Sequence, residues 1–245
     1  MWRMIQDAYN PDWMPGRDAF FHIMDRHGLT LKRPKPRHTT NSNHRFRRYK
    51  NLTTGLPLTH SNQLWVSDIT YIDIAGDNNY LHLVTDAYSH KIIGWCLAES
   101  LSAKHTLEAL RMAIAQTGRD DLSGLIHHSD RGIQYCCNAY VEELTIHNIS
   151  ISMTEDYKPT DNAIAERVNG IIKQELIYRR KQFVSFDEAY DAIDKYITFY
   201  NNSRPHMSIG YQTPTMAHQQ EGTQQRQWKS FYERCQQNQD TCLTF

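Results

Sequence analysis

The sequence predicts an α/β protein built on a mixed five-stranded sheet with helices on both faces. Two observations carry this prediction. Three β-branched and aromatic runs follow one another closely from residue 64, and later apolar runs alternate with segments of helical periodicity. Strands joined by tight turns pair antiparallel, whereas strands joined through a helix pair in parallel. The order of three strands, then helix, strand, helix, strand and two helices therefore predicts a mixed sheet.

The predicted strands are β-branched and aromatic runs that end at turn-forming residues. The first, LWVSDITYIDI, is separated from the second by a predicted GDNN turn, and a Ser-His pair precedes the third. These three are expected to form an antiparallel meander. In order, the predicted strands span residues 64–74, 80–88, 91–98, 125–130 and 149–154.

The predicted helices show apolar residues at three- and four-residue spacing. They span residues 103–118, 138–148, 161–178 and 185–201, and a shorter one lies within residues 13–29. Pro15 and Gly16 mark the start of the short helix and Gly28 its end. The complete order of strands and helices is that of the ribonuclease H-like fold.

The chain of 245 residues divides by composition into three predicted parts. Residues 1–57 form a basic N-terminal segment with a short helix, residues 58–217 the core, and residues 218–245 a Gln-rich tail. The formal net charge of zero conceals an asymmetry, because residues 1–60 hold eleven Lys and Arg against four Asp and Glu. The front of the chain is therefore basic and the remainder acidic.

The basic charge is concentrated in residues 31–50, which hold eight Lys or Arg and no acidic residue. Such a segment favours the phosphate backbone of nucleic acids. A solvated basic linker explains the same composition equally well. On the first interpretation, Arg45, Arg47 and Arg48 are candidate DNA contacts.

Composition argues against several other classes of protein. The five cysteines include no CxxC pair and are odd in number, which favours neither a zinc site nor a disulfide framework. No signal peptide and no long apolar run is evident, so an intracellular protein that does not enter the membrane is expected. His127 and His128 are consecutive in a strand and point to opposite faces, so we interpret both as structural.

Three acidic residues lie in distinctive places, namely Asp68 in the first strand, Asp130 at the end of the fourth and Glu166 in a late helix. Taken singly, they are explained as an edge-strand acid, a loop acid and a solvated helix glutamate, respectively. Together they suggest a cation site, because carboxylates that converge repel one another unless Mg²⁺ or Mn²⁺ neutralises them. The expected chemistry is two-metal cleavage of phosphodiesters.

Neighbours of these acids are candidate DNA contacts. Asn162 lies one turn before Glu166 and Lys173 two turns after it, so the three line one helix face. An exposed Glu/Lys face is the alternative for this helix alone, and Asp161 is a candidate N-cap. Gln134 and Tyr135 follow Asp130 in the loop that Gly132 opens to close approach, and both are expected to touch DNA.

Several motifs in combination resemble the catalytic domain of retroviral-type integrases, most closely the OrfB-type transposases of the insertion-sequence-three family. They are WVSDITYI, VTDAYSHKIIGW, HHSDRGIQY, DNAIAERVNGIIKQEL and YNNSRPHMSIGYQTP, and they cover about residues 60–217. The resemblance implies a ribonuclease H-like core and a triad of Asp68, Asp130 and Glu166 that holds two Mg²⁺ or Mn²⁺ ions. It further implies that Lys173 contacts DNA phosphate and that Arg204, in the last motif, is structural or faces DNA.

The implied function is a transposase that cleaves and joins the DNA of an insertion sequence. A ribonuclease H-like nuclease that does not join DNA, and a non-catalytic DNA-binding remnant or regulator of transposition, are the alternatives. The resemblance implies a homo-oligomer on DNA and an upstream helix-turn-helix protein as fusion or partner. The expected location is the bacterial cytoplasm, in association with the nucleoid.

Overall fold

The computed structural model describes the chain except for residues 10–12, 31–44, 156–161, 181 and 225–245. Every predicted strand is present, and β1 has the predicted bounds. In chain order the elements are α1 (Trp2–Tyr9), α2 (Arg17–Arg26), β1 (Leu64–Ile74), β2 (Asp77–Asp86), β3 (Ile92–Ala98), α3 (Ala103–Thr117), β4 (Ile126–Ser129), α4 (Ile133–Cys136), α5 (Asn138–Ile146), β5 (Ser150–Met153), α6 (Ala163–Ile172), η1 (Lys173–Ile177), α7 (Phe186–Asn202), η2 (Met207–Ile209) and α8 (Pro214–His218).

The sheet has five strands in the order β3-β2-β1-β4-β5. β2 pairs antiparallel with both β1 and β3, whereas β4 pairs in parallel with both β1 and β5. The hairpin-linked strands thus form the antiparallel half of the sheet, and the strands reached through helices form the parallel half. The predicted fold class is confirmed.

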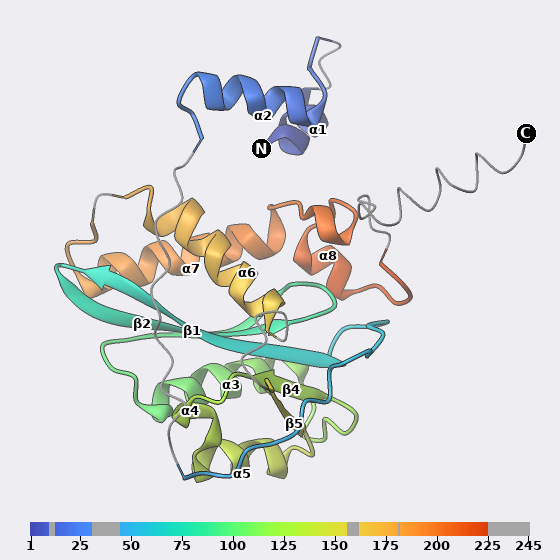
Figure 1. Ribbon diagram of the computed structural model, residues 1–245, viewed down its shortest axis with the longest axis vertical. Coiled ribbons are helices and arrows are strands. Elements are labelled where there is room, and N and C mark those ends of the chain that lie inside the picture. The colour runs from blue at the N-terminus through green and yellow to red at the C-terminus, as the bar shows by residue number, and fades with distance from the viewer. Residues whose placement is uncertain (10–12, 31–44, 156–161, 181, 225–245) are drawn as a thin grey trace, which may run out of the picture.

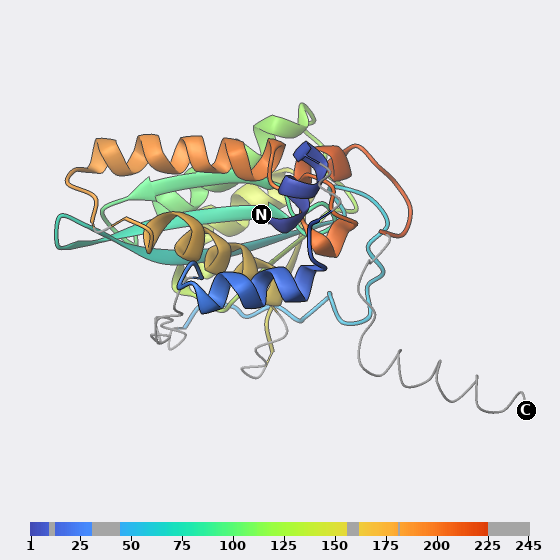
Figure 2. The ribbon, with the colours of Figure 1, turned by 90° about the horizontal axis from the view of Figure 1, so that it is seen from above.

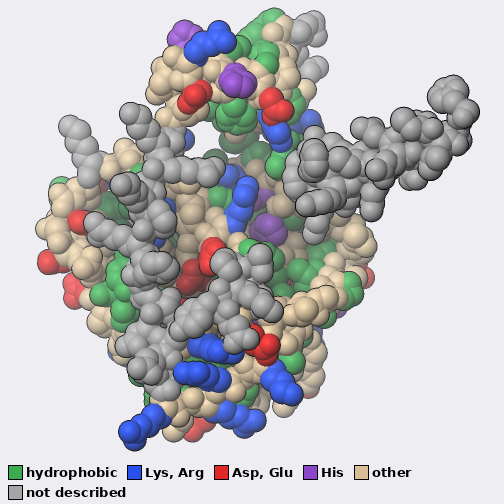
Figure 3. Space-filling model, viewed as in Figure 1, with side chains coloured by type: hydrophobic (Ala, Val, Ile, Leu, Met, Phe, Trp, Pro, Cys, Tyr) green, Lys and Arg blue, Asp and Glu red, His purple; other side chains and the backbone are tan. Residues whose placement is uncertain are grey.

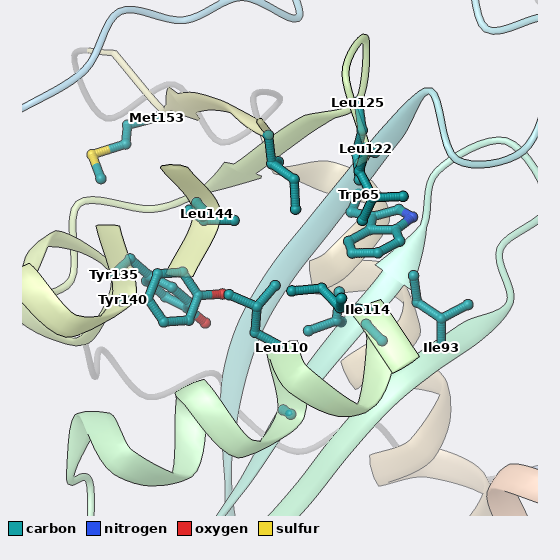
Figure 4. Close-up of a cluster of buried hydrophobic side chains, with 14 of the residues drawn as sticks. Trp65, Ile93, Leu110, Ile114, Leu122, Leu125, Tyr135, Tyr140, Leu144 and Met153 are labelled. Atoms are coloured by element: carbon teal, nitrogen blue, oxygen red, sulfur yellow. The ribbon is translucent and has the colours of Figure 1, made fainter. Parts of the chain in front are cut away.

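Helices cover both faces of this sheet, with α3, α4 and α5 on one side and α6 and α7 on the other (Figures 1 and 2). Alternate residues of β1 supply the two cores. Trp65 packs in the cluster beneath α3 and α5 (Figure 4), whereas Ile72 and Ile74 pack in the cluster beneath α6 and α7. Even-numbered side chains of β1 therefore face α6, and odd-numbered ones face α3.

The turn between β1 and β2 differs from the prediction. Ile74 pairs with Asp77, so the turn consists of Ala75 and Gly76, both with positive φ, rather than of GDNN. Two consecutive residues with positive φ are what a type I′ hairpin turn requires, and such a turn follows the twist of the two strands. The asparagines that suggested a turn in the sequence instead begin β2.

The predicted helix of residues 161–178 is divided in the structure. α6 ends at Ile172, and the chain continues as the π-helical turn η1. The residue before α6 is Asn162, whose side chain makes no capping hydrogen bond. The predicted cap Asp161 lies outside the described residues.

The core continues past the predicted boundary at residue 217. The N–H of Gly222 donates to the carbonyl of Thr59 at 2.7 Å, and the Tyr88 hydroxyl donates to the carbonyl of Gly222 at 3.0 Å. Residues 218–224 therefore pack with the core rather than with the tail, most of which lies outside the described residues. The short helix at the N-terminus is present as α2, whereas α1, α4 and α8 are additional to the prediction. Within the described parts of the chain, no helix is both long and apolar enough to span a membrane.

Candidate active site

Asp68 lies on the α6 side of β1 and has two hydrogen-bond donors. The backbone N–H of Ile69 donates to its Oδ1 at 2.9 Å, and the side-chain amide of Asn169 donates to its Oδ2 at 2.8 Å. Burial, followed by the neighbouring carboxylate of Asp130, nevertheless raises the pKa of Asp68 to about 7. The protein therefore supplies too little positive potential for this carboxylate to ionise readily on its own.

Asp130 lies beside Asp68 because of the parallel pairing of β1 and β4. Val66 pairs with His128, and the two aspartates each follow their member of that pair by two residues. Asp130 Oδ1 accepts a hydrogen bond from the N–H of Gly132 at 2.9 Å. A Cβ on Gly132 would lie 2.9 Å from the same oxygen, so this turn requires glycine to hold the carboxylate in place.

Glu166 reaches the same region from α6, where it lies in the first turn. Burial raises the pKa of Glu166, and its charge is one of the contributions that raise the pKa of Asp68. The oxygens of Asp68, Asp130 and Glu166 do not all lie within 4.8 Å of one another. In the described part of the chain, a different group of three metal-binding side chains meets that distance. Mutual repulsion accounts for this spacing, and two cations shared among three carboxylates do not require a single tight cluster.

Asn169 was not predicted from the sequence, although it lies three residues after Glu166 and therefore on the same side of α6. Its amide nitrogen holds Asp68, while its Oδ1 is buried without a hydrogen-bond partner. The Asn169 amide therefore supports Asp68 from behind, and the three carboxylates themselves form an all-oxygen donor set. Such a set fits Mg²⁺ or Mn²⁺.

Lys173 begins η1 and lies within electrostatic reach of Asp68. Burial lowers the pKa of its ammonium group, and the charge of Asp68 partly offsets that effect. Asn162, at the other end of α6, is 6% exposed and donates its amide to the carbonyl of Ser67 at 3.1 Å. The structure therefore uses the Asn162 amide to fasten α6 to β1, next to Asp68.

Besides Asn162, two further predicted DNA contacts are engaged inside the protein. Tyr135 is 2% exposed because α4 turns its ring into the core beneath α3 and α5. A DNA contact by Tyr135 is incompatible with that position, and no periodic pattern in the sequence indicates α4. The Arg204 guanidinium binds both oxygens of Glu175, at 2.6 and 2.9 Å. It ties η1 to the end of α7.

The remaining predicted contacts lie nearer the surface. Gln134 is partly exposed and donates its amide to the carbonyl of Leu101 at 3.2 Å. Arg45, Arg47 and Arg48 are exposed, and the Arg47 guanidinium lies 5.0 Å from the centre of the Tyr49 ring. The predicted basic residues before them, 31–44, lie outside the described residues.

The described end of the basic segment is anchored beside β5. The N–H of Leu52 donates to Ser152 Oγ at 2.8 Å, and the N–H of Asn51 donates to Glu155 Oε1 at 2.9 Å. The charges of Arg48 and Arg131 both act on the thiol of Cys136 in α4, which places them near the turn that follows Asp130. Figure 3 shows the face of the molecule that is seen in Figure 1. Acidic side chains lie near the middle of this face, with Lys and Arg side chains above and below them.

The consecutive histidines have the structural role expected from the sequence. His127 shares hydrogen bonds with Ser67 Oγ at 2.8 Å and the Tyr140 hydroxyl at 2.9 Å. His128 Nδ1 shares one with Ser152 Oγ at 2.8 Å. Both rings are buried, and they bond to neighbours on opposite faces of the sheet.

Comparison with known proteins gives matches along the whole core. Two models of the integrase core domain match residues 59–159 and 147–214. The insertion element IS600 uncharacterized 31 kDa protein of Shigella sonnei is 35% identical over 203 residues, which are 81% of this chain and 73% of that protein. Transposase InsF for insertion sequence IS3A of Escherichia coli is 34% identical over 154 residues, 62% of this chain and 52% of that protein.

A relative encoded by insertion sequence element IS986/IS6110 of Mycobacterium tuberculosis is 36% identical over 152 residues, covering 61% of this chain and 55% of that protein. The chain thus spans about half the length of several curated relatives. Among solved structures, the HTLV-2 integrase catalytic core domain in complex with magnesium has a TM-score of 0.52 at 22% identity, over 66% of this chain and 99% of that one. The simian T-cell lymphotropic virus intasome structure has a TM-score of 0.56 at 18% identity, over 94% of this chain and 78% of that one.

The sheet order and these structural likenesses show a ribonuclease H-like fold, and the two family models identify it as an integrase core domain. Within that class, the sequence matches show that the chain belongs to the transposases of the insertion-sequence-three family.

Proposed function

We propose that this chain is the catalytic part of a DNA transposase that cleaves and joins the DNA of an insertion sequence. One observation carries the proposal. Asp68 lies within β1 and Asp130 directly follows the adjacent parallel strand β4, opposite Glu166; burial and the neighbouring Asp130 carboxylate raise the pKa of Asp68 to about 7. Membership in the transposase family supports the same function.

Asp68, Asp130 and Glu166 would hold two Mg²⁺ or Mn²⁺ ions. Such ions activate a water or a DNA 3′-hydroxyl and stabilise the leaving oxygen in phosphodiester chemistry. The side chain of Asn169 and the N–H of Ile69 fix the orientation of the Asp68 carboxylate. The N–H of Gly132 does the same for Asp130.

Charged side chains around the carboxylates would bind the DNA backbone. Lys173 lies within electrostatic reach of Asp68, and its ammonium group would contact a phosphate next to the reacting one. Arg45, Arg47 and Arg48 are exposed on the segment that runs beside β5 toward the turn after Asp130. This arrangement provides a cationic border on one side of an acidic centre, as a phosphodiester substrate requires.

The proposed partners are transposon-end and target DNA and further copies of the same chain on that DNA. A helix-turn-helix protein, fused or separate, would select the transposon ends, as the family resemblance implies. The proposed location is the bacterial cytoplasm at the nucleoid.

The proposal is tested with terminal-repeat oligonucleotides, a target plasmid and Mg²⁺, using the chain alone and fused to the protein of the upstream reading frame. We expect nicked and joined products from the wild type and neither from Asp130→Asn or Glu166→Gln. Asp73→Asn is the matched control, because Asp73 lies on the same strand as Asp68 but is exposed on its other face.

The products of this assay distinguish the alternatives. Nicked DNA that is never joined, with the fusion protein folded, would identify a nuclease instead. If the wild type and the triad variants all lacked both products but altered transposition equally in cells, the chain would be a regulator that binds DNA without cleaving it.

A further inference from the structure

A second group of metal-binding side chains lies where β3 meets α3. Cys96 comes from β3, and His105 and Glu108 come from the first turns of α3. The two helical residues are three positions apart and therefore share one side of α3. Within the described parts of the chain, this is the group of three whose donor atoms all lie within 4.8 Å of one another.

The distances between these donors suit a tetrahedral cation. The Cys96 thiol donates to Glu108 Oε2 at 3.3 Å, and His105 Nδ1 lies 3.1 Å from the same oxygen. Zinc bonded to sulfur, nitrogen and oxygen at its usual lengths separates neighbouring ligand atoms by about 3.3–3.7 Å. Little movement of the three side chains is therefore needed to admit an ion between them.

This group is separate from the carboxylates of the proposed active site. Ile69 pairs with His82, and His82 pairs with Cys96, so the three share one face of the sheet. That face carries α3, whereas Asp68 points to the face that carries α6. The donor types differ as well, since Mg²⁺ prefers oxygen ligands and a thiolate with imidazole prefers zinc.

His82 forms the floor of the group. Its ring is 1% exposed, shares a hydrogen bond with Thr106 Oγ1 at 2.9 Å, and lies 6.1 Å from the His105 ring between centres. This buried ring closes the inner side of the group.

We propose that Cys96, His105 and Glu108 bind one Zn²⁺ ion that fastens the start of α3 to the edge strand β3. Binding releases the thiol proton to solvent. The fourth position of the ion is open to water, because the side chain of Glu108 is 44% exposed and that of His105 is 25% exposed. The ion is structural, and it acts on the side of the sheet opposite the proposed active site.

The test is metal binding by the chelator-treated full chain in excess Mg²⁺, which occupies the oxygen-ligand site. We expect Co²⁺, as a zinc probe, to give the absorption of a tetrahedral thiolate complex at one equivalent. Zn²⁺ should displace it. At a free concentration one hundred times its Kd, Zn²⁺ should raise Tm by roughly 5 °C or more.

Cys96→Ala and His105→Ala should each lose one equivalent of bound metal and the rise in Tm. Cys137→Ala and Glu143→Gln are the matched controls, since Cys137 is also partly buried and Glu143 also lies beside a histidine, His147, which follows the end of α5. If Cys96→Ala does not fold, Glu108→Gln serves as the second variant for the same loss of bound metal and of the rise in Tm. Unchanged Co²⁺ spectra in Cys96→Ala, or no thiolate absorption in the wild type, would overturn the proposal.

Discussion

Asp68 and Asp86 are aspartates on neighbouring strands, and their surroundings shift their pKa values in opposite directions. Asp86 is fully buried at the end of β2, where burial alone would raise its pKa. The His218 ring, whose Nδ1 lies 3.6 Å from Asp86 Oδ1, and hydrogen bonds from Ser89 and the N–H of Asn62 outweigh burial and lower the pKa of Asp86. Part of the Asp68 side chain still reaches solvent, yet its pKa is raised to about 7.

The difference shows that hydrogen-bond and charge partners, rather than burial, separate a structural carboxylate from a proposed ligand. Ser89 and Asn62 together donate three hydrogen bonds to Asp86, at 2.6 to 2.8 Å, and thereby satisfy both of its oxygens. Asp68 has two donors and a neighbouring carboxylate that repels it. A carboxylate whose charge the protein leaves unbalanced is one that a cation can stabilise.

The largest expected effect is on DNA joining. Asp68→Asn should reduce strand transfer by roughly 10³-fold or more, because the uncharged amide cannot hold a divalent ion. Asp86→Asn, assayed below its own Tm, should stay within about tenfold of the wild type, since its neighbours are structural. Quantified joining of labelled terminal-repeat DNA measures both. Equal losses in the two variants would remove the distinction between these aspartates.

The order of the two aspartates should be reversed for stability, with the larger effect at Asp86. Asp86→Ala should lower the free energy of unfolding by about 3 kcal/mol, because buried donors that bonded a carboxylate lose their acceptor. Asp68→Ala should change it by less than about 1 kcal/mol or raise it when no divalent ion is present, because a repelled carboxylate is removed. Urea unfolding in EDTA measures both variants. A larger loss for Asp68→Ala would contradict this account.

The two aspartates should also give opposite pH dependences. The pKa of Asp68 is about 7 in the folded chain, whereas the ordinary value for an aspartate is 3.8. The folded state therefore keeps the carboxyl proton to a higher pH than the unfolded state does. In EDTA, its contribution to stability should fall as pH rises from 4 to 7, on the order of 2 kcal/mol after allowance for solvent screening.

The contribution of Asp86 should instead be present above pH 3.8 and be lost as pH falls through its lowered pKa. Subtracting the unfolding free energy of each alanine variant from that of the wild type across pH 3–8 isolates the two terms. Slopes of the same sign for both residues would show that their surroundings do not differ as described.

The smallest expected effect comes from the hydrogen bond between Asn169 and Asp68. Asn169→Ala should weaken Mg²⁺ binding by roughly tenfold, because partners behind a metal ligand contribute about that much. Asn148→Ala is the control, since the Asn148 amide bonds an exposed aspartate, Asp121. Calorimetric titration of Mg²⁺ provides the measurement. An unchanged affinity in Asn169→Ala would show that this contact does not position the carboxylate.

Much of the fold could be predicted from the sequence because it depends on local pattern. The run of β-branched and aromatic residues predicted the bounds of β1, which holds Asp68. Parallel strands joined through helices then placed Asp130 beside it. Residues 218–224, by contrast, join the core through backbone bonds to Thr59 and Tyr88, which no local pattern indicates.

Errors at the candidate site have the same origin. Tyr135 enters the core through the four-residue helix α4, which is too short to leave a periodic signal. Arg204, predicted to be structural or to face DNA, binds Glu175 and so has the structural role, and the position of Glu175 depends on the π-helical turn η1. Asn169 could have been found by asking which side chains share the Glu166 side of α6, because three-residue spacing brings them together.

The most direct test of the central claim is a pH titration of the Asp68 carboxyl carbon by NMR, assigned with Asp68→Asn, in EDTA and then with Mg²⁺. This account predicts a pKa of about 7 without the ion. With saturating Mg²⁺, we expect a pKa below about 5, because a bound cation favours the ionised form. A pKa near 4 in EDTA that Mg²⁺ does not change would show that Asp68 is not part of a cation site.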